Sequence, residues 1–543
     1  MSSKNFKIVL VSVILDAAVI LEDIGLCYIA AYLRKKGYDV NIVSEMVSKL
    51  TVDKITIFKP DIVGFSTYNQ TIKKIKELST SLKAELPNVK IVYGGNTATF
   101  YSEELMQDCP ELDFIVKGEG EFTTYELVNC LSNNLDFNHI NGLVYRKDGI
   151  IICNPASNLI ENLDILPEPA RDILEKHQLK IAILSESRGC THNCYFCSSH
   201  SFWKEPNKKF CWRTRSTELI LDEIQNLYNT YHVHHFWFSD PSFEDPGFNE
   251  KRMTDICNGI IERNLTISFI IYIRGDFYKK VSDKLMNLLT RAGLSSVFIG
   301  AESINDSDRK IYGKEASTED IINSMHFFKK YDISVDIGFI NFNPYSTFEG
   351  LKQNCDFLWK HGYFVCEHHL SKIMVFKGSR IYNRLLNDNL LYNGSYDNLF
   401  GYHFIDSRIE ELCTFLSSFM KTLRSKTHVF EEITILTHLQ QARLACIKRH
   451  IHSTSQNGMR LKKLLDEYAQ QLDFYCMKIN DEIHEWYSNL LDYAEQGKTS
   501  DYLLQYSLKN LDIVQLQNYT NEMKKLKILL IKKIGKNKYS YLL

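Results

Sequence analysis

The sequence predicts an α/β chain in three parts: a doubly wound parallel sheet over residues 1–150, a partial (β/α)6 barrel over 181–385, and a mainly helical region over 386–543. Short runs rich in Val, Ile and Phe alternate with helical patterns in the first two parts, as strands buried on both faces require. With 543 residues the chain is also too long for one compact core. Beyond residue 386 the pattern is helical and rich in Leu, Tyr and Lys.

The first part begins with a predicted strand at 6–13, which is followed by a helix that ends at Gly37. Further strands are expected in the runs DVNIV, DIVGFS, VKIVYGG and DFIVKGEGE. Residues 142–154 are predicted to form a hairpin that turns at Asp148–Gly149, because this dipeptide favours a tight hairpin turn. A sheet of this kind binds ligands in a crevice at the carboxyl ends of its strands.

Residues 151–180 are predicted to be a linker, because three prolines and a polar stretch interrupt the pattern. Six strands are expected after it, at 181–187, 235–240, 267–273, 296–302, 333–340 and 369–376. Helical patterns separate them, among them Glu218–Tyr231, Asp283–Ala292 and Thr318–Lys330. Since six strands are two short of a closed eight-stranded barrel, we expect an open barrel with a laterally accessible interior.

Charge and hydropathy indicate which partners and which cellular compartment to expect. The formal net charge of −2 supplies no electrostatic argument for nucleic acid as a general partner. Asp16, Glu22 and Asp23 interrupt the apolar N-terminal run, which is therefore predicted to be a buried strand and not a signal peptide. No uncharged apolar run is long enough for a transmembrane helix. We therefore expect a cytoplasmic protein, in whose reducing environment clustered cysteines indicate a metal site or catalysis.

The strongest chemical signal is the segment SRGCTHNCYFCSSH at 187–200. Cys190, Cys194 and Cys197 follow a predicted strand and can bind three irons of a 4Fe–4S cluster. The fourth iron would then be open to a substrate or cofactor. The alternative is a zinc site completed by His192 or His200, but structural zinc usually uses paired half-sites and no second half-site is evident.

The CxxxCxxC spacing of these cysteines resembles the radical S-adenosylmethionine (SAM) superfamily. The resemblance implies that Cys190, Cys194 and Cys197 hold the cluster and that its open iron chelates the amino and carboxylate groups of SAM. Reductive cleavage of SAM would then yield methionine and a 5′-deoxyadenosyl radical. Phe196 would lie near the adenine, although core packing explains an aromatic residue there equally well.

Later segments follow the order expected for this family. The segment 237–246 resembles FxDDxF and keeps Asp240, but Pro241 takes the place of the second acid. Arg274 resembles the basic residue that pairs with the SAM carboxylate. Glu302 and Ser303 belong to a GxES-like segment, with Glu302 expected to face SAM. Two further segments, 337–351 and 375–386, resemble IxGxPxET and PGTxLY, with Asn341 and Asn343 in place of the usual small residues.

The first part resembles the cobalamin-binding domain that precedes many radical SAM domains, and 166–174 resembles the PxPARD connector of this branch. The resemblance implies that the loops at the ends of the strands face cobalamin, with Thr67, Tyr68, Gly94, Gly95, Gly118 and Glu119 as the candidate residues. The glycines would allow close approach of the backbone. No DxHxxG motif occurs in 1–150, which predicts cobalt without a lower histidine ligand and leaves a domain that binds nothing as an alternative.

The resemblance implies a cobalamin-dependent radical SAM methyltransferase that acts on an unactivated carbon. One SAM would methylate cobalamin, and a second would supply the radical. Two alternatives stay open: a cobalamin-linked cyclase or rearrangement enzyme without methyl transfer, and a cobalamin or redox sensor with a helical output domain. The expected partners are an external electron donor and a substrate that the sequence does not identify: a peptide, an antibiotic precursor, a lipid or a tetrapyrrole. By position alone, residues 386–543 would cap the barrel and select this substrate.

Three further features have simpler explanations. Cys153, Cys211 and Cys355 are more consistent with scattered buried thiols than with a second cluster. His232, His234 and His235 precede a strand and suit a solvated loop as well as a metal site. The segment 523–538 is basic and amphipathic; a final helix over the core is the favoured interpretation, and a membrane surface or partner the alternative.

Overall fold

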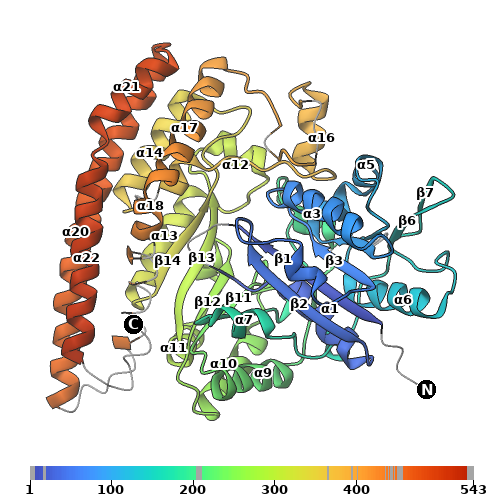
Figure 1. The fold of residues 1–543 in the computed structure, drawn as a ribbon. Coiled ribbons are helices and arrows are strands. Elements are labelled where there is room, and N and C mark those ends of the chain that lie inside the picture. Colours follow the sequence, from blue (N-terminus) through green and yellow to red (C-terminus); the bar gives the residue numbers. More distant parts are fainter. Residues whose placement is uncertain are drawn as a thin grey trace.

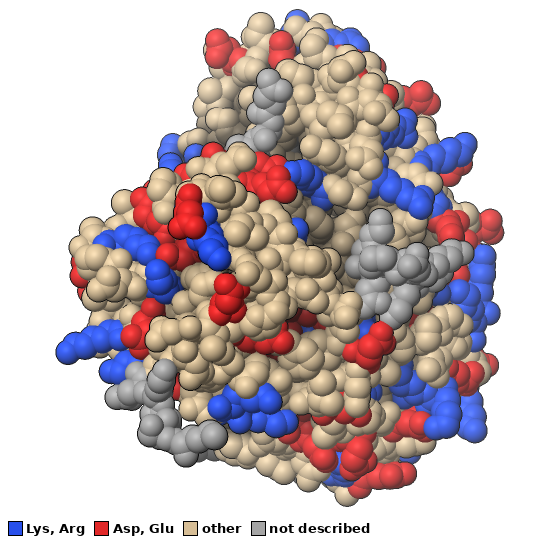
Figure 2. All heavy atoms as spheres, turned by 90° about the vertical axis from the view of Figure 1, so that its right-hand side faces the viewer, with Lys and Arg blue, Asp and Glu red and all other residues tan. Residues whose placement is uncertain are grey.

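The computed structural model of the chain describes residues 6–534, apart from 16–19, 204–210, 364–365, 393–395, 400 and several positions between 435 and 455. Figure 1 shows three parts in sequence: a sheet flanked by helices on the right, a second sheet in the centre, and long C-terminal helices along the left edge. On the face that the first part presents in Figure 2, acidic and basic side chains are interspersed, in keeping with the small net charge.

The first sheet has seven strands in the order β2-β1-β3-β4-β5-β6-β7, and β1 to β5 are parallel. Helices α1 and α6 cover one face, and α3 and α5 cover the other. The doubly wound sheet is therefore confirmed. Its strands are β1 (Lys7–Ile14), β2 (Asp39–Met46), β3 (Ile62–Ser66), β4 (Lys90–Gly94), β5 (Phe114–Val116), β6 (Leu143–Lys147) and β7 (Ile150–Cys153). Its helices are α1 (Ile24–Lys35), α2 (Asp53–Thr56), α3 (Ile72–Glu85), α4 (Asn96–Phe100), α5 (Ser102–Asp108) and α6 (Gly120–Asn133).

The predicted hairpin is β6–β7, which pairs antiparallel at the edge of this sheet. Asp148 and Gly149 have φ values of 51° and 80°, the left-handed conformation that a tight hairpin turn requires. Because β7 ends at Cys153, the first sheet continues slightly beyond the predicted boundary at residue 150.

The second sheet has five parallel strands in the order β14-β13-β12-β11-β8. They are β8 (Ile181–Leu184), β11 (His235–Phe238), β12 (Ser268–Ile273), β13 (Leu294–Glu302) and β14 (Ser334–Phe339). The sixth predicted strand, 369–376, contributes only a parallel bridge between Lys372 and Phe342 beyond the end of β14. The partial barrel is confirmed, and its sixth position is occupied by an irregular segment.

Helices connect the strands of the barrel, and α11 and α13 have the predicted bounds. The connecting helices are α9 (Thr217–Thr230), α10 (Glu250–Glu262), α11 (Asp283–Ala292), α12 (Asp306–Tyr312), α13 (Thr318–Lys330), α14 (Phe348–Lys360), α15 (Cys366–Leu370) and α16 (Arg380–Asn387). Two short strands, β9 (Ser187–Arg188) and β10 (Arg213–Thr214), pair antiparallel beside the cysteine segment. The remaining short helices are α7 (Asp172–His177) and α8 (Ser198–Phe202).

The C-terminal part is helical, as predicted, and shares one hydrophobic core with α12, α14 and α16. Its described helices are α17 (Ser407–Lys426), α18 (Val429–Thr434), α20 (Gln456–Glu495), α21 (Ser500–Asn510) and α22 (Ile513–Ile534). No helix among the described residues is both long and apolar enough to cross a membrane.

Two asparagines explain a departure from the family pattern. Asn341 donates hydrogen bonds to the hydroxyl of Tyr487 on α20 at 3.0 Å and to the carbonyl of His369 at 2.8 Å. Asn343 donates to Asp308 at 2.8 Å and to the hydroxyl of Tyr312 at 2.9 Å. All of these groups are buried. The amides therefore tie the end of β14 to α12 and α20, a contact that small residues at these positions could not make.

Glu482 on α20 makes stability depend on pH. Burial, together with the charge of Asp512, raises the pKa of this carboxyl from 4.5 to about 7. The folded protein therefore holds this proton more tightly than the unfolded chain, so stability falls as pH rises from about 4.5 to 7. We expect Glu482→Gln to stabilise the protein by about 1 kcal/mol at pH 8 and to have no effect at pH 4. Urea unfolding at both pH values measures this, and Glu467→Gln, at an exposed position on the same helix, serves as the control. Equal effects at the two pH values would contradict the assignment.

Candidate cofactor site between the two sheets

An interdomain cavity of about 610 Å³ lies between the carboxyl ends of the two sheets. The first sheet contributes the ends of β3, β4 and β5 through Ser66, Gly94 and Gly118. The barrel contributes Ser185, Trp237 and Tyr272, together with residues on both sides of the three-cysteine segment. The cavity therefore joins the region predicted for cobalamin to the region predicted for the cluster.

The three cysteines lie on a tight loop between β9 and α8. Gly189, immediately before the loop, has a φ of 92°, and a Cβ there would stand 1.6 Å from the carbonyl oxygen of Cys211. Only glycine fits this position. Tyr195, inside the loop, donates its backbone N–H to Tyr312 and accepts one from Ile381, each at 2.9 Å. Segments far apart in the sequence thus anchor the loop.

Cys190, Cys194 and Cys197 are free, partly buried thiols. Burial raises the pKa of Cys190 to about 12 and also raises the pKa of Cys194, against which the charge of Lys314 acts. Three thiols on one loop suit an iron–sulfur cluster, in which each thiolate binds a different iron. Among the residues that the structure describes, no three His, Cys, Asp or Glu side chains come together as a site for a metal ion.

Glu302 and Lys314 form a charged pair beside this loop. Glu302 has a left-handed backbone with φ 64° at a register shift where β13 ends. Its carboxylate lies 3.3 Å from the ammonium of Lys314. Burial alone would lower the pKa of Lys314, but Glu302 and Cys194 raise it, so the side chain is a cation. The sequence offered no signal for Lys314, because it follows α12 without a motif that separates it from other lysines.

Arg274 already has anionic neighbours in the structure. Its guanidinium lies 3.1 Å from Asp245 and 3.3 Å from Glu244, and it contacts His192 in the cysteine loop. Asp245 in turn accepts hydrogen bonds from the hydroxyl and the backbone of Thr191 at 2.7 and 3.1 Å. These contacts hold the loop in place, and the predicted pairing of Arg274 with the SAM carboxylate stays a prediction.

Two of the predicted residues make buried hydrogen bonds, and a third packs against the core. Asp240 accepts from the hydroxyl of Ser187 at 2.6 Å, and burial raises its pKa to about 7. Ser303 donates to Asp308 at 3.1 Å and to Asn354 at 3.2 Å. The ring of Phe196 packs edge-on against Tyr312, with centroids 5.8 Å apart, which is the core packing considered as the alternative.

Five of the six residues predicted for cobalamin line the interdomain cavity: Tyr68, Gly94, Gly95, Gly118 and Glu119. Tyr68 is 45% exposed although the cavity encloses it, and the negative charge of Asp23, together with burial, raises the pKa of its phenol. Thr67 points away from the cavity and donates a 2.7 Å hydrogen bond to the carbonyl of Gly94. The loops lie at the cavity, as expected from the ends of the strands, but the sequence did not indicate the direction of every side chain, and binding of cobalamin by these residues stays a prediction.

A buried ionic joint holds the two sheets together. Arg171, in the connector, lies 2.7 Å from Glu22 of the first part and also contacts Glu223 of α9 in the barrel. Arg215 completes the group through Glu223. Glu22 also accepts the N–H of Ile183 on β8 at 3.1 Å, and Arg171 donates to the carbonyl of the same residue at 3.2 Å. The connector that family resemblance identified is therefore the centre of an interdomain contact.

A second part of the joint connects α6 to the cysteine loop. Arg188, two residues before Cys190, lies 2.7 Å from Glu119 and 2.5 Å from Glu121. Arg213 pairs with Glu119 at 2.8 Å. All four side chains are at least nine-tenths buried. Glu119, predicted for cobalamin, thus lines the cavity while it fixes the position of the loop.

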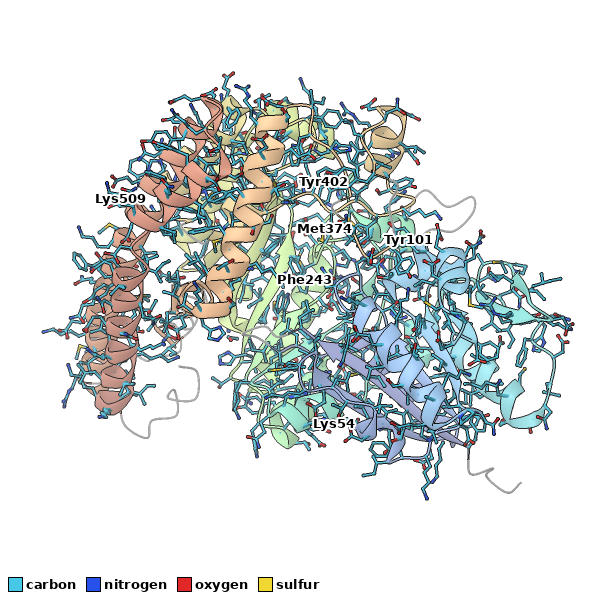
Figure 3. All side chains as sticks on the ribbon, turned by 45° about the horizontal axis from the view of Figure 1, so that its top comes forward. Lys54, Tyr101, Phe243, Met374, Tyr402 and Lys509 are labelled. Carbon is cyan, nitrogen blue, oxygen red and sulfur yellow. The ribbon has the colours of Figure 1, made fainter. Side chains whose placement is uncertain are left out.

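The two parts also meet on the other side of the cavity. The ring of Phe100 packs against Phe376 at 6.4 Å, and the ammonium of Lys377 lies 5.8 Å from the ring of Tyr101. Tyr396 is buried in the core of the first part and receives a 2.7 Å hydrogen bond from Lys76. Figure 3 labels Tyr101 and Met374 on the two sides of this contact.

The remaining candidates have local partners. His235 makes a 2.6 Å hydrogen bond to Ser268, and His234 packs against Tyr228. Cys153 is exposed, whereas Cys211 and Cys355 are buried. The expectation of buried thiols is therefore confirmed for Cys211 and Cys355 and is wrong for Cys153.

Two family models match the chain. The B12 binding domain matches residues 10–128, and the radical SAM superfamily matches residues 184–358. The first range covers most of the helix-flanked parallel strands, and the second runs from the last residue of β8 through the cysteine segment and the later barrel strands into α14.

Curated relatives carry both methyltransferase and cyclase names. The "uncharacterized methyltransferase PH0819" of Pyrococcus horikoshii is 29% identical over 68% of this chain and 79% of its own length. The anaerobic magnesium-protoporphyrin IX monomethyl ester cyclase of Rubrivivax gelatinosus is 31% identical over 58% of this chain and 57% of its own length. The match therefore spans little more than half of that cyclase.

Solved structures share the fold. The cobalamin-dependent SAM radical enzyme OxsB, with aqua-cobalamin and SAM bound, superposes with a TM-score of 0.66 at 19% identity, over 99% of this chain and 82% of its own. The radical SAM methyltransferase TsrM from Kitasatospora setae superposes with a TM-score of 0.57 at 15% identity, over 71% of this chain and 78% of its own.

A parallel sheet of the B12-binding type, packed against an open barrel with a three-cysteine loop, defines a radical SAM enzyme with a cobalamin-binding domain. The chain belongs to the radical SAM superfamily, in the branch whose members carry a B12-binding domain before the radical SAM domain. Membership implies a 4Fe–4S cluster, SAM and cobalamin as cofactors.

Substitution of Arg188 tests how much the ionic joint contributes to stability. Arg188→Met would leave Glu121 buried without its ion-pair partner, whereas Glu119 would keep Arg213. We expect a loss of about 3–5 kcal/mol in the free energy of unfolding, part of which Glu121→Gln recovers in the same chain. Urea unfolding measures both effects. Arg291→Met, at an exposed position, should change stability by no more than about 0.5 kcal/mol. Equal losses in the free energy of unfolding for Arg188→Met and Arg291→Met would show that the buried ion pairs of Arg188 are not required for stability.

Proposed function

We propose that the chain is a cobalamin-dependent radical SAM methyltransferase that acts on an unactivated carbon. The observation that carries the proposal is the shared interdomain cavity, which borders both the glycine loops of the first sheet and the cysteine loop of the barrel. A methyl donor and a radical initiator must both reach one substrate, and a common cavity permits this.

When bound, the cluster and SAM supply the electron and the radical, and cobalamin supplies the methyl group. The residues of the chain hold and orient these groups. Cys190, Cys194 and Cys197 would ligate the cluster. Glu302 and Lys314, with opposite charges beside Cys194, match the amino and carboxylate groups of SAM. Trp237 and Tyr272, whose rings lie 5.8 Å apart at the cavity, would form the substrate wall.

Gly94, Gly95 and Gly118 would let cobalamin approach the backbone of the first sheet, with Tyr68 beneath it. The buried pairs of Arg188 with Glu119 and Glu121 form part of the cavity wall and would keep water out. The external electron donor and the identity of the substrate belong to the same proposal, and the remaining SAM contacts, Phe196, Asp240, Arg274 and Ser303, stay predictions.

A cyclase or rearrangement enzyme without methyl transfer is the second candidate. The relatives named anaerobic magnesium-protoporphyrin IX monomethyl ester cyclase favour it. Two other relatives support methyl transfer, the methyltransferase of Pyrococcus horikoshii and the hopanoid C-3 methylase of Methylococcus capsulatus.

Product analysis separates these candidates. We would reconstitute the chain anaerobically with iron, sulfide and cobalamin, add SAM and a strong reductant, and analyse the products by mass spectrometry. Methyl transfer predicts both 5′-deoxyadenosine and S-adenosylhomocysteine. Changing Cys190, Cys194 and Cys197 together to Ala should reduce 5′-deoxyadenosine to background.

The matched control is Cys153→Ala, which removes one exposed thiol outside the loop. If 5′-deoxyadenosine forms alone, methyl transfer fails and the second candidate takes its place. A protein with an intact cluster that forms neither product would contradict catalysis and favour the sensor.

The cavity also predicts a variant that loses cobalamin without unfolding. A Cβ at Gly94 would meet only the carbonyl oxygen of Val116, at 3.8 Å, so the fold tolerates a side chain there. In Gly94→Val the new methyl groups would point into the interdomain cavity, and we expect the Kd for cobalamin to rise about tenfold or more. Equilibrium dialysis with hydroxocobalamin measures the Kd, and Lys90→Val at the other end of β4 is the control. Unchanged binding would place cobalamin elsewhere.

A further inference from the structure

The far end of the α20–α22 hairpin forms a surface that the cofactor chemistry does not use. The rings of Tyr475 on α20 and Tyr519 on α22 lie 5.9 Å apart, and because α21 and α22 both pack back along α20, α22 runs opposite to α20 (Figure 1). The start of α20 therefore lies beside the end of α22, and Leu461 and Leu530 share one core. Figure 1 shows these helices along the edge of the molecule that is farthest from the first sheet. We call residues 459–463 and 524–534 the hairpin tip.

Large apolar side chains of the hairpin tip face outward. Met459 is 56% exposed, Ile528 54%, Leu529 48% and Ile531 39%. Met523 and Leu530 are buried, so α22 does cover the core through one face. The final helix predicted to lie over the core thus has a second apolar set, which is exposed in the described part of the chain.

The same tip is strongly basic. It has no acidic residue, and its basic residues are Arg460, Lys462, Lys463, Lys524, Lys525, Lys527, Lys532 and Lys533. Lys524 and Lys525 pair with Glu432 and Glu522. Arg460, Lys462, Lys463, Lys532 and Lys533 form no ion pair with any residue in the described part of the chain. In a protein with a net charge of −2, this is a local concentration of positive charge.

We propose that the hairpin tip docks on an anionic membrane surface. Apolar side chains can enter the boundary between headgroups and acyl chains, while neighbouring cations bind the lipid phosphates. Each Lys or Arg near such a surface contributes about 1 kcal/mol, which corresponds to about a fivefold change in binding. A nucleic acid would match the cations but leave the apolar side chains in water. Exposed apolar side chains and unpaired cations at one end of a helical hairpin are typical of an interfacial membrane anchor. This inference does not depend on the proposed reaction.

Vesicle sedimentation tests the proposal with the full-length chain. We expect it to sediment with vesicles of phosphatidylcholine and phosphatidylglycerol but not with phosphatidylcholine alone, and added salt should release it. Changing Ile528, Leu529 and Ile531 together to Ser should weaken binding about tenfold or more. Changing Lys532 and Lys533 together to Ser should weaken it about twenty-five-fold, which is the product of two fivefold effects.

The matched control changes Leu508 on α21 and Val514 at the start of α22 to Ser, outside the hairpin tip, where they are 67% and 71% exposed. This variant should bind vesicles as the unchanged protein does. All substitutions are at exposed positions, and circular dichroism checks that each variant folds. Failure of the unchanged protein to bind anionic vesicles, or equal loss in the control, would overturn the proposal. The proposal would also be overturned if the unchanged protein were a dimer and the Ile528, Leu529 and Ile531 variant were a monomer with unchanged vesicle binding.

Discussion

The arrangement of the site depends on the buried ionic joint between the two sheets. β8 is the edge strand of the barrel, and an edge strand leaves backbone groups without partners. Here Glu22 accepts the N–H of Ile183 and Arg171 donates to its carbonyl, so side chains take the place of a neighbouring strand. The same two side chains pair with each other. The same side chains therefore satisfy the backbone of the edge strand and hold the two sheets together.

Such a joint sets orientation more than it adds stability. Burying charges costs desolvation that good pairing only offsets, whereas hydrogen-bonded ion pairs form only when their groups have the right relative orientation. Each guanidinium in this group contacts carboxylates in fixed directions, and Arg188 bonds to both Glu119 and Glu121. Because Arg188 is two residues from Cys190, the first part holds the cysteine loop at a defined distance from its own glycine loops. The shared cavity follows from that constraint.

The sequence predicted the strands well because strands such as β1, β3 and β4 have nearly continuous apolar runs that are largely buried on both faces. The sixth strand of the barrel was not predictable in the same way. Residues 369–376 pair only at Lys372, because the chain then leaves the sheet to bring Phe376 and Lys377 to Phe100 and Glu104 of the first part. A local sequence pattern cannot predict this contact, because the residues on its two sides lie far apart in the sequence.

The functional site shows the same difference between features that depend on neighbouring residues and features that depend on distant ones. The cysteine loop and the glycines could be found because each depends on a few consecutive residues. Lys314 and Arg188 could not be found, because their roles arise where separate segments meet. For Thr67, Asp240 and Ser303 the sequence identified the segment but not the direction, since a polar residue after a strand can face the cavity or bond to the body of the protein. In this structure all three do the latter.

Both edges of the open barrel are covered, and this accounts for the two asparagines that depart from the family pattern. On the β8 side the ionic joint binds the exposed backbone. On the β14 side the chain continues to Asn341, which bonds to Tyr487 of α20, while Ser371 accepts the backbone N–H groups of Asn341 and Phe342 at 3.1 and 2.9 Å. A small residue at 341 would leave the hydroxyl of Tyr487 without this buried donor. The C-terminal helices thus cover the open edge of an incomplete barrel: the amide of Asn341 attaches α20, and the amide of Asn343 fixes the end of β14 to α12.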